Sequence, residues 1–192
     1  MRPAERPERG TLGGDSVGHM TDADEGTGTA PSPADIFSAD DGIEKLWVQA
    51  YQGEVLGEAL FGAIADRLDD ADHARKMRVL ATLELRTKEA VAPALARAGI
   101  STAPDPEMLS LAEALAPDSA TRAWEEIMVS LEAITGQFIP LYDRIAQLDP
   151  AEREAADLLV AHEAALRDFA RAELAGDTAT SLAPVTALAH MR

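Results

Sequence analysis

The sequence predicts an all-α protein built as a four-helix bundle with a long connection between its second and third helices. Apolar residues recur at alternating intervals of three and four, a spacing that places each set on one face of a helix. These repeats cover residues 47–68, 73–98, 124–145 and 155–169. The composition is 46% hydrophobic but only 4% aromatic, a balance rich in Ala and Leu that favours helix over sheet.

The first two repeats are predicted to form a helical hairpin. Residues 38–41 (Ser-Ala-Asp-Asp) resemble an N-cap with acids in the first turn, so the first helix should run from about 41 to 69. Aspartates at 69, 70 and 72 mark a turn, and the second helix should cover about 71 to 98. Gly99 follows, in the position where a left-handed residue usually ends a helix.

A long connection, from 99 to about 118, precedes the third helix. It contains two prolines and a short amphipathic stretch around residues 108–115. Such a link can travel the length of a bundle as a crossover. The alternative is an up-down-up-down bundle with an irregular loop, and the helix-like stretch favours the crossover.

The last two repeats are predicted to form a second hairpin. Residues 117–119 (Pro-Asp-Ser) should cap a third helix at about 119–147, and residues 149–150 (Asp-Pro) a fourth at about 150–175. Gly176 should end the fourth helix.

The two ends of the chain differ from the bundle, which is predicted to span 37–176. Residues 1–36 are rich in Gly, Pro, Asp, Thr and Ser, which predicts a disordered segment. Residues 177–192 form a C-terminal tail with Leu182, Val185 and Leu188. Three apolar residues are enough to dock a tail but not to build a domain.

Charge and cysteine content exclude several classes of function. Seventeen basic and thirty-four acidic residues give a net charge of −17, which argues against nucleic acid and anionic membrane surfaces as partners. No apolar run approaches the roughly 18 residues of a membrane span. The absence of cysteine excludes disulfides, thiolate metal sites and cysteine nucleophiles. A cytoplasmic location is the default expectation.

Acids and a histidine interrupt the apolar faces near their middle. Glu54 and Glu58 lie about 40° apart on the first helix, Glu84 is midway along the second, and His162 is central in the fourth. A carboxylate driven into a core needs compensation, and none of the four faces contains Lys or Arg. A bound metal is the usual candidate. The alternative is raised pKa values and shared protons among the carboxyls.

Other interpretations of these residues stay open. A lone Glu on an apolar face is usually at a boundary or paired with a basic residue, which is the favoured interpretation of Glu58. A lone core histidine is usually hydrogen-bonded, although His162 should face the acids. Glu132 and Glu163 lie about 100° off their faces and are interpreted as flanking residues, although either could reach inward from a wide core.

Four helices, a long second connection and inward acids resemble the ferritin-like superfamily, particularly its rubrerythrin-type branch, over about residues 41–175. Such bundles hold two metals with a Glu from each of two helices and a Glu-x-x-His pair from each of the others. Residues 51–54 (Tyr-Gln-Gly-Glu) stand where the first Glu is expected. Residues 84–87 (Glu-Leu-Arg-Thr) keep the acid but not the histidine, and 159–162 (Leu-Val-Ala-His) keep the histidine but not the acid.

The resemblance implies a partial ligand set of Glu54, Glu84 and His162 that would hold one Fe, Mn or Zn ion. Glu58 would act as a catalytic proton carrier, and it or Glu163 could add a ligand. The implied activity is metal-dependent redox chemistry on a small molecule, by an oxidoreductase. The alternative is a non-catalytic, metal-free helical module that binds a ligand or partner. Separately, the Ala-rich helix faces make a homodimer an expectation, since such bundles often pair. The residues expected to line the pocket are Tyr51, Thr87, Thr135 and Tyr142.

Overall fold

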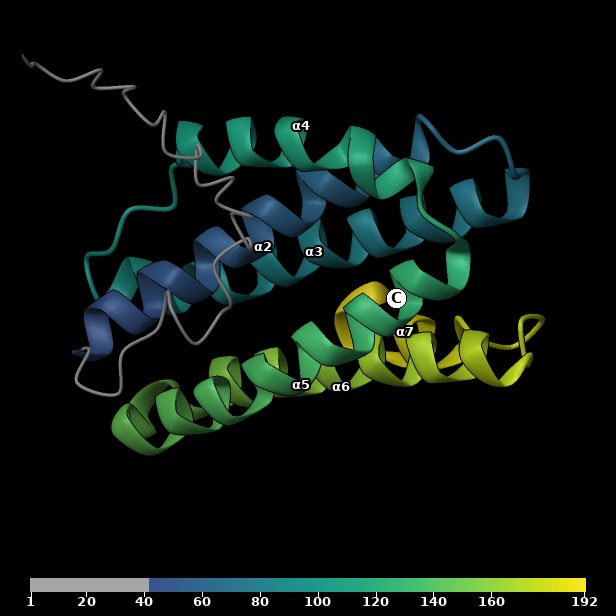
Figure 1. The fold of residues 1–192 in the computed structure, drawn as a ribbon. Coiled ribbons are helices and arrows are strands. Elements are labelled where there is room, and N and C mark those ends of the chain that lie inside the picture. The colour runs from purple at the N-terminus through teal and green to yellow at the C-terminus, as the bar shows by residue number, and fades with distance from the viewer. Residues whose placement is uncertain (1–41) are drawn as a thin grey trace, which may run out of the picture. The chain divides into compact units, whose positions relative to one another are not determined.

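The computed structural model describes residues 42–192, and all regular structure in that part of the chain is helical (Figure 1). The all-α prediction is therefore confirmed for these residues. The predicted disorder of 1–36 and the predicted N-cap at 38–41 lie outside them. The elements are α2 (Ile43–Ala65), α3 (Ala71–Arg97), α4 (Pro106–Thr121), α5 (Trp124–Leu148), the 3₁₀ turn η1 (Pro150–Glu152), α6 (Arg153–Ala175), α7 (Ala183–Ala187) and the 3₁₀ turn η2 (Ala189–Met191).

The helix ends follow local signals in the sequence. The carboxylate of Asp70 caps α3 by accepting hydrogen bonds from the backbone N–H groups of Asp72 and His73, both at 2.9 Å. Gly99 and Gly176 follow α3 and α6 with φ of 72° and 85°. Both adopt the left-handed conformation that glycine reaches without steric cost, as predicted.

The prediction for the start of the third long helix was wrong. Residues 117–119 do not cap it; they lie inside α4, and α5 begins only at Trp124. The carboxylate of Asp105 starts α4 by accepting from the backbone N–H of Glu107 at 2.8 Å. Pro117 has no backbone N–H, so it leaves the carbonyl of Glu113 without an intrahelical donor. Both residues are exposed, so water can reach that carbonyl and the proline is tolerated inside α4.

The helices of residues 42–192 are arranged in layers. The most extensive contacts join α5 to α6 and α2 to α3, and α4 packs along α2. Figure 1 shows α4 on one side of the α2–α3 pair and α5–α6 on the other. After α6, α7 packs against α6 and η2 against α3, so the segment after Gly176 is docked on the bundle.

Two groups of contacts fix the ends of the helices. The indole Nε1 of Trp47 donates to Asp149 Oδ2 at 3.0 Å, which joins the start of α2 to the end of α5. Arg97 makes two hydrogen bonds of 2.6 Å to Glu152, which join the end of α3 to the start of α6.

At the opposite end, the rings of His73 and Trp124 stack at 4.0 Å between centroids, 2° from parallel. This contact joins the start of α3 to the start of α5. The two helices therefore begin at the same end of the bundle.

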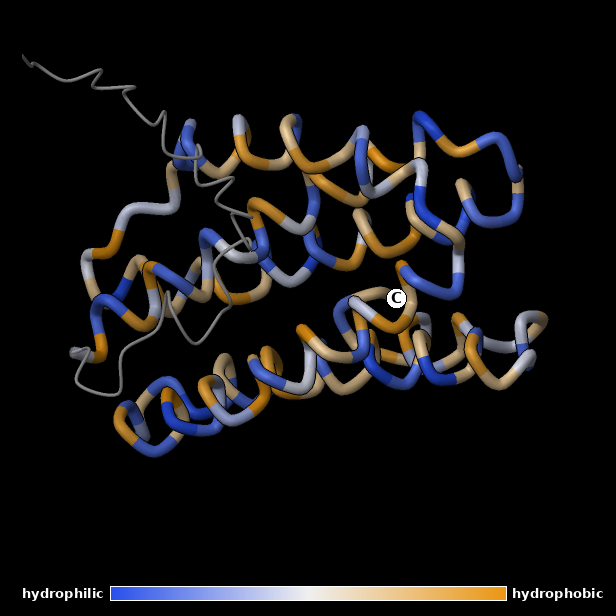
Figure 2. The backbone as a smooth tube through the Cα atoms, viewed as in Figure 1, coloured by the Kyte–Doolittle hydropathy of each residue, from blue (hydrophilic) through white to orange (hydrophobic). Residues whose placement is uncertain are grey.

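The core consists of two apolar clusters, one near each end of the bundle. The first contains Trp47, Tyr142 and Leu159, and the second contains Leu80 and Phe169. Figure 2 shows apolar and polar residues interleaved along each helix, as expected where one face is buried.

A buried ion pair lies beside the second apolar cluster. Lys76 is only 1% exposed, and its Nζ lies 2.7 Å from Glu173 Oε1 and 2.8 Å from Asp72 Oδ2. The other oxygen of Glu173 accepts a 2.8 Å hydrogen bond from Trp124 Nε1. Burial alone would lower the pKa of Lys76, but its hydrogen bonds to Asp72 and Glu173 outweigh that effect and raise the pKa. Lys76 is therefore a charged residue in the core, outside the four predicted faces.

Candidate metal centre

A layer of buried polar side chains separates the two apolar clusters. On α3, α5 and α6, the polar residues fall between members of the first cluster and members of the second, whereas Glu54 on α2 follows Tyr51 within the first cluster. On α6, for example, His162 and Glu163 lie between Leu159 and Leu166. The layer contains Glu54 from α2, Glu84 and Thr87 from α3, Thr135 from α5, and His162 and Glu163 from α6.

His162 is at the centre of this layer. Its Nε2 lies 3.4 Å from Glu54 Oε2 and 3.5 Å from Glu84 Oε2. Its Nδ1 lies 2.8 Å from the hydroxyl of Thr87. The structure thus brings together the three residues that the sequence nominated as ligands, although their role as ligands stays a prediction.

Glu163 joins the group: it reaches inward, the alternative to its interpretation as a flanking residue. It is only 5% exposed, and one ligand atom each from Glu54, His162 and Glu163 lie within 4.8 Å of one another. α6 packs against both α5 and α3, so it buries a wider face than the single apolar face predicted from its sequence. Glu132, in contrast, is partly exposed and pairs with Arg171 at 2.6 Å.

The carboxyl groups of the layer hold their protons unusually tightly. Burial raises the pKa of Glu84 and of Glu163 to about 8. Burial also raises the pKa of Glu54 well above its usual value, although the attraction of His162 opposes this. The pKa of Tyr142 is raised for the same reason, and its side chain hydrogen-bonds to Glu54. The layer therefore resists carrying several negative charges unless a cation compensates them.

Two oxygens of the layer are available to such a cation. Glu54 Oε2 and Glu163 Oε2 are buried and accept no hydrogen bond from the described residues, a costly state for a polar atom. Two carboxylates and an imidazole are ligands that suit Fe, Mn or Zn. The residues of the layer therefore fit a single metal ion.

Gly57 leaves the space that the carboxyl of Glu84 occupies. A Cβ added at Gly57 would lie 2.7 Å from Glu84 Cδ and 2.9 Å from Oε2, closer than Cβ atoms approach other atoms. Glu84 is itself buried among α2, α3 and α6, so the carboxyl cannot move away freely. A side chain at position 57 would displace Glu84 from the layer.

Gly57→Ala is therefore expected to weaken metal binding by about 10-fold or more, since loss of even an outer partner of a metal site has an effect of that size. The control is Gly53→Ala in the same helix, whose Cβ would lie 3.8 Å from the hydroxyl of Tyr142, an ordinary contact. Alanine at position 53 should stabilise α2 by up to about 1 kcal/mol and leave metal affinity unchanged. Calorimetric metal titration and thermal unfolding of both variants test this. Equal affinities would show that Glu84 is not needed.

Other residues nominated from the sequence lie around the layer. Glu58 pairs with Lys88, and its side chain is 35% exposed, so it lies nearer the surface than the buried acids. The hydroxyl of Thr135 donates to backbone carbonyls of its own helix, those of Leu131 and Glu132, both at 3.0 Å. Tyr51 packs in the first apolar cluster. The catalytic role of Glu58 and the pocket-lining roles of Tyr51, Thr87, Thr135 and Tyr142 stay predictions.

The sequence interpretation missed His190. This residue lies in η2, and its Nε2 is 3.2 Å from the hydroxyl of Thr87. Burial, and the nearby His162, lower the pKa of His190. No spacing rule links the tail to α3, so the sequence held no signal for this contact.

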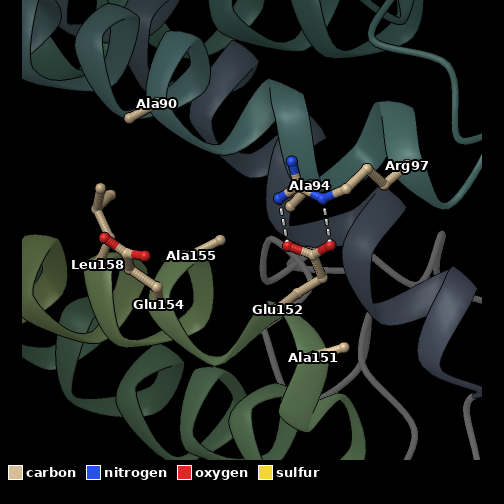
Figure 3. Close-up of a pocket in the computed structure, with 8 residues that line it drawn as sticks. All are labelled: Ala90, Ala94, Arg97, Ala151, Glu152, Glu154, Ala155 and Leu158. Atoms are coloured by element: carbon tan, nitrogen blue, oxygen red, sulfur yellow. Dashed lines mark hydrogen bonds and ion pairs between the residues drawn. The ribbon is translucent and has the colours of Figure 1, made fainter.

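A surface pocket between α3 and the start of α6 is separate from the layer. Figure 3 shows alanines from both helices along it, with Arg97 and Glu152 joined across one side. None of its lining residues belongs to the buried polar layer.

In the part that the structure describes, no helix combines the length and apolar character needed to cross a membrane.

Similarity to known proteins gives no further guide to the chain. No protein-family model, curated protein or solved structure matches the sequence.

Proposed function

We propose that this chain is a ferritin-like bundle with one divalent metal ion at its centre, acting as an oxidoreductase on a small molecule. The observation that carries the proposal is the buried group of Glu54, His162 and Glu163, with ligand atoms within 4.8 Å of one another and two carboxylate oxygens that accept no hydrogen bond from the described residues. A small-molecule substrate, a homodimer and a cytoplasmic location remain predictions.

The helix directions support the ferritin-like part of the proposal. α2 and α6 begin at one end of the bundle, because Trp47 bonds to Asp149 beside the start of α6 and Arg97 pairs with Glu152. α3 and α5 begin at the other end, where His73 stacks on Trp124. The connection that contains α4 would then act as a crossover along α2, giving the up-down-down-up order of a ferritin-like bundle.

Glu54, His162 and Glu163 would hold the ion, with Glu84 as a fourth ligand. A redox-active ion such as Fe or Mn would supply electron transfer to the substrate, whereas Zn would act only as a Lewis acid. Glu163 would take the place of the acid that residues 159–162 lack. Leu159 and Leu166, which bracket His162 and Glu163 on α6, would exclude water from the ligands.

Several residues of the chain would hold or exchange protons at this centre. In the metal-free chain, Glu54 and Glu84 share a hydrogen bond, which requires that one of the two carboxyls carries a proton that a bound cation would displace. The hydroxyl of Tyr142 bonds to Glu54 and provides a second exchangeable proton there. Lys88, which is paired with Glu58, acts on Glu54 and Glu84 from the side nearer the surface, where its charge favours their ionised forms.

Metal titration of the chelator-treated full-length chain tests the proposal. We expect about one Fe, Mn or Zn ion per chain, and stabilisation of about 2.7 kcal/mol at a free metal concentration 100 times the dissociation constant. His162→Ala and Glu163→Ala should lose both effects. Glu132→Gln, which alters an acid paired with Arg171 outside the layer, is the control and should retain them. Dioxygen uptake by the iron-loaded chain then tests the redox part.

A metal-free binding module is the second candidate, and the raised pKa values of Glu84 and Glu163 favour it. Carboxyls with a pKa of about 8 can stay neutral near pH 7 without a cation. If this candidate holds, no metal will bind, added metal will leave the thermal midpoint unchanged, and replacing Glu54 and Glu84 together by Gln will maintain or raise stability. That pattern would overturn the metal proposal.

A further inference from the structure

The docked tail connects to the centre of the bundle through a chain of three side chains. Val185 of α7 is fully buried and fixes the tail in the second apolar cluster. η2 then brings His190 Nε2 to within 3.2 Å of the hydroxyl of Thr87. That hydroxyl is fully buried and lies 2.8 Å from His162 Nδ1. Thr87 is thus shared between two imidazoles, one central and one in the tail.

A hydroxyl has a single hydrogen, so its two partners are not independent. If Thr87 donates to His190 Nε2, it can only accept from His162, whose Nδ1 must then carry a hydrogen. The remaining nitrogen of a neutral His162, Nε2, then presents a lone pair. Nε2 is the nitrogen that faces the carboxylates of Glu54 and Glu84, and a metal ligand must offer a lone pair.

We propose that His190 is a positioning residue which, through Thr87, holds His162 in the tautomer whose Nε2 is free to bind a metal. The inference rests on the proposed function for its metal, but the hydrogen-bond direction belongs to the chain alone. His190 must offer a lone pair for this role. Its lowered pKa, caused by burial and by His162, keeps it neutral near pH 7 and so supports the role.

The reverse direction has the opposite consequence. A His190 that donated from Nε2 would occupy a lone pair of the Thr87 oxygen and free the hydroxyl hydrogen to point at His162 Nδ1. His162 would then carry its hydrogen on Nε2, pointing at Glu54 and Glu84, and could not bind a metal through that atom. The tail would therefore control whether His162 can act as a ligand.

Nitrogen-15 NMR of the imidazole rings in the metal-free, full-length chain at about pH 7 tests the inference. We expect a hydrogen on His162 Nδ1 in the wild-type chain. His190→Phe keeps a ring but offers no acceptor, and Thr87→Val keeps the shape of the side chain but removes the hydroxyl. Each should raise the share of His162 that carries its hydrogen on Nε2 only. His190→Gln retains an acceptor oxygen and should behave as the wild type.

Zinc affinity provides the second readout. His190→Phe and Thr87→Val should each weaken binding by about 10- to 100-fold, the usual effect of removing an outer partner of a metal-binding histidine, and His190→Gln should restore most of it. Thermal unfolding of each metal-free variant identifies any that fail to fold. His190→Phe removes the acceptor of the hydrogen bond between Thr87 and His190, and Thr87→Val removes its donor. An unchanged His162 tautomer in both folded variants, or a failure of His190→Gln to match the wild type, would overturn the inference.

The two readouts separate this inference from the proposed function. If the wild-type chain binds no zinc, the proposed function fails, but the NMR spectra of the metal-free variants still decide the hydrogen-bond direction. If zinc binds wild type and variants equally and the His162 tautomer does not change, the metal centre stands and the role of His190 is lost.

Discussion

Replacing Lys76 by methionine is expected to lower the free energy of unfolding by about 3–5 kcal/mol, the usual cost of removing one partner of a buried ion pair. Methionine is close to lysine in length, so the loss will come from charge more than from packing. The carboxylate of Glu173, whose side chain is fully buried, would keep Trp124 as a hydrogen-bond donor but lose its cation. Denaturant unfolding of the metal-free chain measures the effect.

Two further variants show whether the buried pair is responsible. Arg75→Met removes a cation that also pairs with Asp72, at 2.7 Å, but in solvent, and should cost less than about 1 kcal/mol. Lys76→Met combined with Glu173→Gln removes both charges and leaves Trp124 an acceptor, so it should recover much of the loss. A cost for Lys76→Met no larger than that for Arg75→Met would contradict the prediction.

Most of the helices could be predicted because their signals are local. Apolar spacing found all four long helices, and Gly99 and Gly176 marked the ends of two of them because glycine adopts a positive φ without strain. The connection between α3 and α5 was harder. Pro117 predicted a helix start, but buried Ala112 and Ala116, just before it, hold α4 against the bundle, and α4 continues through Pro117 to Thr121. Tertiary packing therefore overrode the proline signal.

The candidate site was only partly predictable, because part of it depends on packing. Glu54, Glu84 and His162 could be found, since each interrupts an apolar face and the faces meet in one core. Glu163 could not be assigned from the arithmetic of a single face, because α6 is covered from two directions. His190 arrives from a tail whose docking depends on Val185, and nothing in the spacing of the tail predicts its register against α3.

The metal-free chain is also expected to lose stability as pH rises from about 4.5 to 8. In the unfolded chain, glutamate titrates near pH 4.3, whereas burial raises the pKa of Glu84 and Glu163 to about 8 in the fold. Between these values the folded chain binds more protons than the unfolded chain. Stability must therefore fall with pH, by up to about 1.4 kcal/mol per pH unit for each such carboxyl.

Other titrating groups change the slope of stability against pH little between about pH 4.5 and 8. Hydrogen bonds from Lys76 and Arg75 lower the pKa of Asp72 to about 2, so its contribution is lost only as pH falls below about 4. The lowered pKa of His190 acts in the opposite direction near pH 6.5, where the unfolded chain takes up a proton more readily. Glu163→Gln should remove one carboxyl's share of the slope, whereas Glu132→Gln should not.

Metal binding should abolish this loss of stability with rising pH, and metal affinity should itself increase as pH rises. A bound cation keeps the carboxyls of the layer ionised in the fold, so the folded chain no longer carries the extra protons and the slope between about pH 4.5 and 8 disappears. Because protons and metal compete for the same oxygens of Glu54 and Glu163, metal affinity must rise with pH over the range in which the metal-free chain weakens. Denaturant unfolding at a series of pH values, with chelator and with excess zinc, measures both slopes on one sample. Metal-free stability that stays level or rises over this range would mean that the carboxyls are already ionised in the fold, and would remove the charge argument for a cation at this centre.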